Sequence, residues 1–193
     1  EGPTLLLEGV DYPLVHGSVR VFLSGQIYHG LQFTSPEAQS LATSYYCEEG
    51  GLAAVLRELP TTTNRSLGIV GLGAGAFAVH GRTGDTIRFY ELNPEVLRIA
   101  NGYFTFLTNS SAKVNVVLGD GRLSLQNEPT QQFDLLLLDA FTGDSVPSHL
   151  LTDEAMNIYE RQVKPDGVIV FNISNLHLDL RPVLQAVAAK HGF

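Results

Sequence analysis

Residues 133–141 read FDLLLLDAF, in which an unbroken run of four leucines, 135–138, leads directly to an acid, Asp139. A strand that alternates apolar and polar residues has one wet face, whereas an unbroken apolar run requires cover on both faces. A parallel sheet with helices on either side meets that requirement. The run therefore predicts a buried central strand, and Asp139 stands where such a strand would emerge at its carboxyl end.

Similar apolar runs alternate with helical segments from residue 67 onward. The other strand-like runs are LGIVGLG (67–73), TIRFYEL (86–92), VNVVLGD (114–120) and GVIVFNIS (167–174). Segments that favour helix occupy residues 93–107, 121–126, 152–163 and 178–193, and a further helix is expected after the first strand. An alternation of strands and helices predicts a doubly wound α/β domain.

The first third of the chain follows a different pattern. Residues 18–33 alternate around Ser24 and Gly25, which predicts a two-stranded hairpin with a tight turn. Apolar residues at 52, 55, 56 and 59 have helical spacing. We expect an N-terminal β module at 1–35, a helical connection and linker at 36–66, and a Rossmann-like nucleoside-binding domain at 67–193. Because this fold usually has two more strands, we expect the domain to be truncated at its C-terminus.

The composition disfavours several classes of partner. The net charge is −8, and an acidic surface does not attract nucleic acid or anionic membranes. No apolar run approaches the ~20 residues of a membrane-spanning helix, and no signal segment opens the chain, so we expect a cytoplasmic domain. The single cysteine, Cys47, is expected to be a small buried hydrophobe, and the histidines lack metal spacing, so we expect no metal.

A glycine-rich turn follows the first strand of the predicted sheet. Ligands of open parallel sheets bind beyond the carboxyl ends of the strands. Gly71, Gly73 and Gly75 would let the backbone turn tightly and approach a ligand. The turn lacks the third glycine of the dinucleotide fingerprint, which favours a nucleoside sulfonium ligand over NAD. A tight turn that binds nothing is the alternative.

Three acids stand at the other strand ends. Glu91 can accept hydrogen bonds from both ribose hydroxyls, or it is a solvated strand-tip acid. Asp120 and the amide beside it, at Gly121, can meet the exocyclic amine and a ring nitrogen of adenine, or they form a simple Asp-Gly turn. Asp139 can bind or deprotonate an amine, or it caps the next helix or turn.

Taken in order, these motifs resemble the spermidine synthase (polyamine aminopropyltransferase) family. The resemblance is carried by IVGLGAGA (69–76), FYELNPEV (89–96), VVLGDGRLSL (116–125), FDLLLLDAF (133–141) and PDGVIVFNIS (165–174), behind the hairpin and TSYY (43–46). The sequence is most similar to bacterial spermidine-synthase-like domains, some of which are fused to membrane-spanning segments. A membrane segment outside this chain is therefore an expectation as well.

The resemblance implies a class I methyltransferase-like fold, a homodimer and a role in polyamine biosynthesis. It implies decarboxylated S-adenosylmethionine as the co-substrate and a small amine or polyamine as the acceptor, with Asp139 as the catalytic residue that binds and deprotonates the amine. Glu91 would hold the ribose, and Asp120 with Gly121 the adenine. The amine-side residues implied are Tyr45, Tyr46 and Asp144, and the loop at 140–148 would cover the substrates.

Three positions on the amine side differ from the family pattern. Ala74 stands where the family's glycine turn carries an acid, Thr142 where it carries a second acid, and Tyr46 where it carries a glutamine. Aminopropyl transfer is the leading hypothesis. The alternatives are a methyltransferase that uses S-adenosylmethionine itself, and a non-catalytic domain that binds an adenosyl compound or a polyamine.

Overall fold

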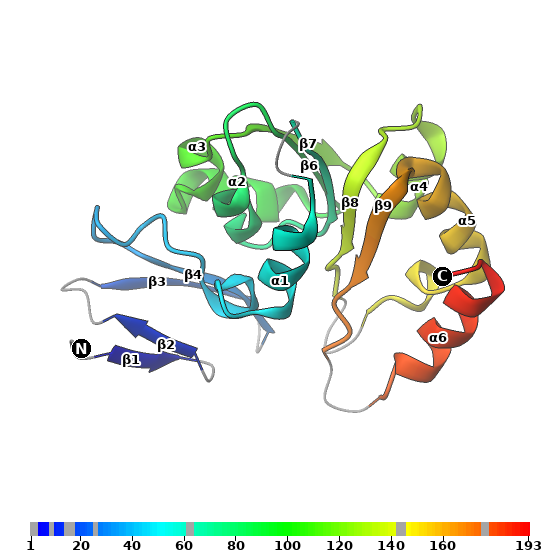
Figure 1. Cartoon of the computed structure of the whole chain (residues 1–193). Helices are drawn as coiled ribbons and strands as arrows, with labels where there is room; N and C mark the ends of the chain where they lie inside the picture. The colour runs from blue at the N-terminus through cyan, green and yellow to red at the C-terminus, as the bar shows by residue number, and fades with distance from the viewer. Residues whose placement is uncertain are drawn as a thin grey trace. The chain divides into compact units, whose positions relative to one another are not determined.

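The computed structural model describes residues 4–7, 10–13, 18–24, 27–60, 64–141, 146–174 and 178–193 (Figure 1). These residues belong to two compact units. The first comprises Glu1–Asn64, Gly73–Asp85 and Glu95–Val114, and the second comprises Arg65–Leu72, Thr86–Pro94 and Asn115–Phe193. The division into three linear segments expected from the sequence stays a prediction.

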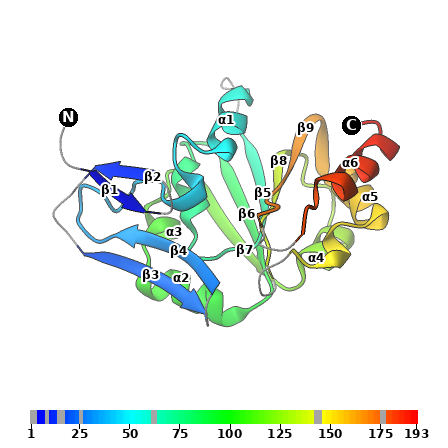
Figure 2. The ribbon, with the colours of Figure 1, turned by 90° about the horizontal axis from the view of Figure 1, so that it is seen from below.

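The second unit is built around a five-stranded parallel sheet. Its strands are β5 (Ser66–Val70), β6 (Thr86–Glu91), β7 (Lys113–Leu118), β8 (Phe133–Leu138) and β9 (Val163–Phe171). Their order is β7-β6-β5-β8-β9, so that β5 lies between β6 and β8 (Figure 2). The parallel sheet and the alternation of strands with helices confirm the predicted α/β class.

The leucine run forms β8, and all six residues of that strand are buried. Successive side chains of a strand point to opposite faces, so Leu135 and Leu136 lie on different faces of the sheet. Both have no exposed surface. The prediction of a strand that is covered on both faces is therefore confirmed.

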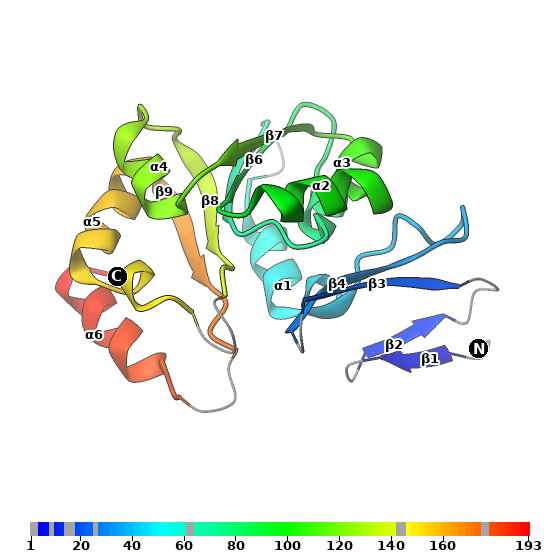
Figure 3. The same cartoon turned by 180° about the vertical axis from the view of Figure 1, so that it is seen from behind.

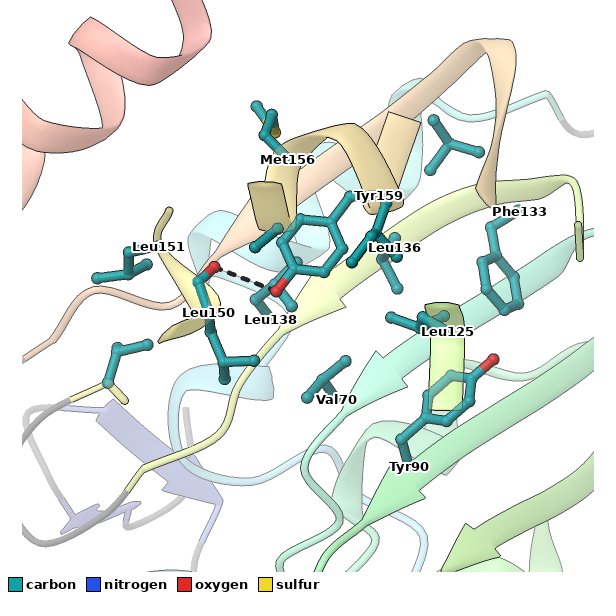
Figure 4. Packing of buried hydrophobic residues seen from close by; sticks show 14 residues of the cluster. Val70, Tyr90, Leu125, Phe133, Leu136, Leu138, Leu150, Leu151, Met156 and Tyr159 are labelled. Atoms are coloured by element: carbon teal, nitrogen blue, oxygen red, sulfur yellow. Dashed lines mark hydrogen bonds between the residues drawn. The ribbon is translucent and has the colours of Figure 1, made fainter. Parts of the chain in front are cut away.

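Three helices of the second unit lie together on one face of the sheet (Figures 1 and 3). They are α4 (Gly121–Asn127), α5 (Asp153–Gln162) and α6 (Arg181–Lys190). Leu125 of α4 and Tyr159 of α5 pack in one cluster with Leu136 and Leu138 of β8 (Figure 4). Within the described ranges, no helix has the length and apolar character that crossing a bilayer requires.

The first unit contains two antiparallel hairpins and several short helices. Strand β1 (Thr4–Leu7) pairs with β2 (Val10–Pro13), and β3 (Val19–Ser24) pairs with β4 (Ile27–Phe33). The helical segments are η1 (Ser44–Tyr46), α1 (Gly51–Glu58), η2 (Ala76–His80), α2 (Pro94–Tyr103) and α3 (Phe106–Asn109). The predicted hairpin, the helix near residues 52–59 and the burial of Cys47 are confirmed, while Gly25 lies outside the described residues.

Three elements differ from the sequence prediction. The segment after the glycine turn forms the short 3₁₀ helix η2 because Gly81 and Gly84 soon follow it. The helix expected at 93–107 is broken, since the Gln32 side chain accepts the backbone N–H of Thr105 at 3.1 Å and donates to its hydroxyl at 2.8 Å. Strand β9 starts earlier than expected, through an irregular register beside Phe133.

A charged cluster holds the end of α6 to α5. His191 Nε2 lies 2.9 Å from Asp153 Oδ1, and its Nδ1 lies 2.8 Å from Glu160 Oε1. Lys190 Nζ lies 2.7 Å from Asp153 Oδ2. Only the imidazolium can donate from both ring nitrogens. The bond to Asp153 raises the pKa of His191 above its ordinary 6.5, and Lys190 followed by His191 lowers the pKa of Asp153.

We expect the variant His191→Gln to melt at a lower temperature than the wild type below about pH 6.5, with a difference that shrinks as the pH rises. The pKa of His191 is higher in the folded protein than in the unfolded chain, where it is 6.5. The stability that its charged form contributes is therefore complete below pH 6.5 and is lost as the pH rises through the pKa of the folded protein. Thermal unfolding of both proteins between about pH 5 and pH 9 measures this.

The matched control for this experiment is Arg181→Gln. Arg181 pairs with Asp179 at the start of the same helix, and its guanidinium stays charged throughout the range. Its effect on the melting temperature should therefore not vary with pH. A loss in the His191 variant that is equal at every pH would contradict the assignment of the imidazolium.

Candidate functional site

The strand ends of the second unit are joined by backbone hydrogen bonds that continue past the strands. Gly71 N donates to the Tyr90 carbonyl, Gly119 N to that of Glu91, Asp139 N to that of Val70 and Asn172 N to that of Leu138, at 2.8 to 2.9 Å. All five carboxyl ends are at one edge because the strands are parallel. Of the predicted site residues, Gly71, Glu91, Asp120, Gly121 and Asp139 are brought to this edge.

The first glycine of the turn is required by the closeness of β5 and β8. Gly71 has φ +105°, and a Cβ at this position would lie 2.2 Å from the Asp139 carbonyl oxygen. The other two glycines belong to the first unit. A Cβ at Gly73 would lie 2.6 Å from the His29 carbonyl oxygen, and one at Gly75 would lie 2.8 Å from the Leu107 side chain. Contacts inside the protein therefore account for the turn, and the glycines alone select no ligand.

Glu91 is held by backbone amides on both of its oxygens. Its Oε2 accepts from Leu72 N at 3.0 Å, and its Oε1 accepts from Asn93 N at 2.8 Å. The residue is only 8% exposed, so the alternative of a solvated strand-tip acid is wrong. The physical reason is that the glycine turn folds its backbone against the carboxylate. Each carboxylate oxygen has a second lone pair, and these two acceptor positions suit a pair of ribose hydroxyls.

Asp120 caps the helix that follows it. Its Oδ1 accepts from Leu123 N at 2.9 Å at the start of α4, and its Oδ2 lies 3.1 Å from His149 Nε2. Gly121 packs closely on β5, since a Cβ there would lie 2.5 Å from Val70. Asp120 is thus an N-cap, a structural role that the sequence reasoning did not consider. His149 was missed as its partner, because no sequence spacing links the two residues.

Asp139 is half-buried, and its Oδ1 accepts from Asn172 Nδ2 at 2.8 Å. Asn172 comes directly after β9, which pairs with β8, so the register of two neighbouring strands brings these side chains together. The next helices begin at other residues: η3 (Ser148–Leu150) follows Pro147, and the Thr152 side chain caps α5. Asn172 is a second residue that the sequence reasoning missed. An asparagine directly after an apolar strand was the available signal.

The residues on the expected amine side differ in their exposure, and two of them lie outside the described part of the chain. Tyr46 is buried and packs edge-on against Phe77, while Tyr45 is exposed, with its ring centroid 4.5 Å from that of Tyr46. Their contact with a substrate stays a prediction. Asp144 and Thr142 lie outside the described residues.

Ala74, which replaces the family's acid, is a buried packing position. It is 1% exposed, and its amide donates to the His29 carbonyl at 3.0 Å. A Cβ added at Gly30 would lie 2.8 Å from the Ala74 Cβ. The β3–β4 hairpin therefore occupies the space beside this methyl group. Across the described part of the chain, no group of three or more His, Cys, Asp or Glu side chains could hold a metal ion.

No family model matches the chain. Over 84 residues it is 34% identical to the polyamine aminopropyltransferase of Vibrio vulnificus (strain CMCP6), and the match covers 42% of the chain and 27% of that protein. The chain thus matches about a quarter of the length of this relative. The resemblance to the spermidine synthase family is confirmed by this match over 84 residues.

Solved structures share the fold. A probable spermidine synthase from Corynebacterium glutamicum ATCC 13032 has a TM-score of 0.64 and 18% identity, over 98% of this chain and 70% of its own. Human methyltransferase-like protein 13, in complex with SAH, has a TM-score of 0.57 and 20% identity, over 78% of this chain and 68% of its own. Spermidine synthase from Thermotoga maritima has a TM-score of 0.54 and 16% identity, over 89% of this chain and 62% of its own. The class I methyltransferase-like fold expected from the sequence is confirmed.

We expect Gly71→Ala to destabilise the protein by about 2 to 5 kcal/mol, through backbone strain and the contact with the Asp139 carbonyl. Urea denaturation measures the loss. The matched control is Gly102→Ala in α2, where an added Cβ meets nothing within 4 Å and the helix should gain up to about 1 kcal/mol. Equal stability of the two variants would show that the ends of β5 and β8 do not constrain the turn.

Proposed function

We propose that this chain is the adenosyl-binding part of a transferase that uses S-adenosylmethionine or its decarboxylated form. The observation that carries the proposal is the Glu91 carboxylate, which is buried at the sheet edge and fixed by two backbone amides. A carboxylate oriented in this way presents its remaining lone pairs in fixed directions, as a ribose diol requires. The methyltransferase-like fold and the similarity to an aminopropyltransferase support the same chemistry.

In this proposal the adenine lies at the start of α4. An amine of the base donates to the Asp120 carboxylate, and the amide of Gly121 donates to a ring nitrogen. The first amides of a helix have no acceptor within the helix, so the Gly121 N–H is suited to an external acceptor. Ribose at Glu91 and adenine at Asp120 use the ends of neighbouring strands, β6 and β7.

The leading activity is transfer of an aminopropyl group from decarboxylated S-adenosylmethionine to an amine. The acceptor nitrogen attacks the carbon beside the sulfonium, the carbon–sulfur bond breaks, and its electron pair leaves with methylthioadenosine. One proton must be lost, either from the ammonium form of the acceptor before attack or from the new ammonium after it, and the Asp139 carboxylate is proposed as the base that takes it. Asn172 supports this role because it fixes one oxygen of the carboxylate.

The packing of Ala74 favours a second candidate, methyl transfer from S-adenosylmethionine. A methyl group at this buried position supplies no carboxylate for the ammonium of an aminopropyl group. A domain that binds an adenosyl compound or a polyamine without turnover is the third candidate. The three differ in their products, which makes them separable by one assay.

We expect Glu91→Gln to weaken binding of methylthioadenosine about 10- to 150-fold, because the ribose hydroxyls lose a charged acceptor. The variant should also lose about 1 to 3 kcal/mol of stability, since its amide group faces the N–H of Leu72 or of Asn93. Calorimetric titration and urea denaturation measure the two effects separately. The control is Glu95→Gln, an exposed acid on α2 that should change neither quantity. Unchanged affinity at Glu91 would refute the proposed ribose contact.

We expect Asp139→Asn to lower turnover about 10²- to 10⁴-fold, with a small effect on methylthioadenosine affinity. The assay supplies both donors with putrescine, cadaverine, spermidine and agmatine, and identifies the products by mass. The control is Asp166→Asn, an exposed acid of β9. Release of methylthioadenosine that needs both an amine and Asp139 supports aminopropyl transfer. Methyl transfer, absence of any product, or full activity in the Asp139 variant would contradict it.

A further inference from the structure

The two oxygens of Asp120 are held from different elements. Leu123 N, in the first turn of α4, donates to Oδ1 at 2.9 Å, and His149 Nε2 lies 3.1 Å from Oδ2. The capping role uses only the bond from Leu123 N to Oδ1, so the contact of Oδ2 with His149 is additional to that structural role. The His149 side chain is 49% exposed and is therefore at the surface of this edge.

The backbone that carries His149 is anchored on two helices. Arg122 Nη1, from α4, donates to the His149 carbonyl at 2.8 Å. The Tyr159 hydroxyl, from α5, donates to the carbonyl of the next residue, Leu150, at 3.1 Å, and Leu150 is buried in the core cluster (Figure 4). The imidazole is thus presented to Asp120 from a fixed segment, which is the arrangement that orients a binding group.

We propose that His149 is a positioning residue for nucleobase recognition, which orients the Asp120 carboxylate toward the exocyclic amine of adenine. The inference rests on the proposed function, in which Asp120 faces the base. An ionised carboxylate only accepts hydrogen bonds, so it favours the 6-amino group of adenine and repels the 6-oxo group of hypoxanthine. The terminal torsion of an aspartate has a broad, two-fold profile, so a second hydrogen bond from His149 narrows the orientations that the capping bond leaves to the carboxylate.

The test compares 5′-methylthioadenosine with 5′-methylthioinosine in calorimetric titrations of the wild type, His149→Ala and His149→Gln. We expect His149→Ala to weaken binding of the adenine compound about three- to tenfold and to lower the adenine preference by a similar factor. His149→Gln should restore most of the affinity and most of the adenine preference, because the glutamine amide can donate to Asp120. Arg181→Gln, exposed on α6, is the control and should change neither affinity nor preference.

Two results would overturn the inference while leaving the proposed function intact. One is unchanged affinity and preference in His149→Ala. The other is equal weakening for both nucleosides without recovery in His149→Gln, which indicates a general structural effect. A wild type that binds neither nucleoside would instead refute the proposed function, and the role of His149 with it. Melting temperatures of all variants show whether a loss of affinity reflects a loss of fold.

Discussion

The close approach of the ends of β5 and β8 is the constraint on which the candidate site depends. The Gly71 Cα lies against the Asp139 carbonyl, and the amide of Asp139 donates to Val70 in continuation of the strand register. No side chain fits between the ends of β5 and β8. The backbone that follows β5 therefore turns directly across the ends of the neighbouring strands. The amide of Leu72 then meets the Glu91 carboxylate, and Asp139 emerges beside Asn172.

Each acid at this edge also makes a hydrogen bond to another residue of the protein. Glu91 accepts the backbone amides of two loops, Asp120 caps α4, and Asp139 is tied to Asn172. Such bonds orient the carboxylates before a ligand arrives, so less ordering is left to occur on binding. The same bonds mean that deleting a side chain changes stability and binding together. Substitutions that keep the shape of the side chain separate the two effects better than truncation to alanine.

The sequence predicted those parts of the structure that follow from local periodicity. The apolar run of β8 indicated a strand covered on both faces, and the acid after it indicated a residue at the carboxyl edge of the sheet. The partners of the acids could not be predicted in the same way. Asn172 reaches Asp139 through the register of β8 and β9, and His149 reaches Asp120 from a separate 3₁₀ helix. Burial of Glu91 depends on the path of the glycine turn, which spacing does not encode.

The contact between Gly30 and Ala74 limits which residues can stand at position 30. Gly30 lies in β4 with φ +136°, in a hairpin whose register is irregular between Phe22 and Leu23. A Cβ at residue 30 would lie 2.8 Å from the Ala74 Cβ, so the glycine leaves the room that the Ala74 methyl group needs. Glycine is therefore required at position 30 for as long as residue 74 carries a side chain. Because residue 30 has no side chain to lose, no substitution there can make room for a carboxylate at position 74.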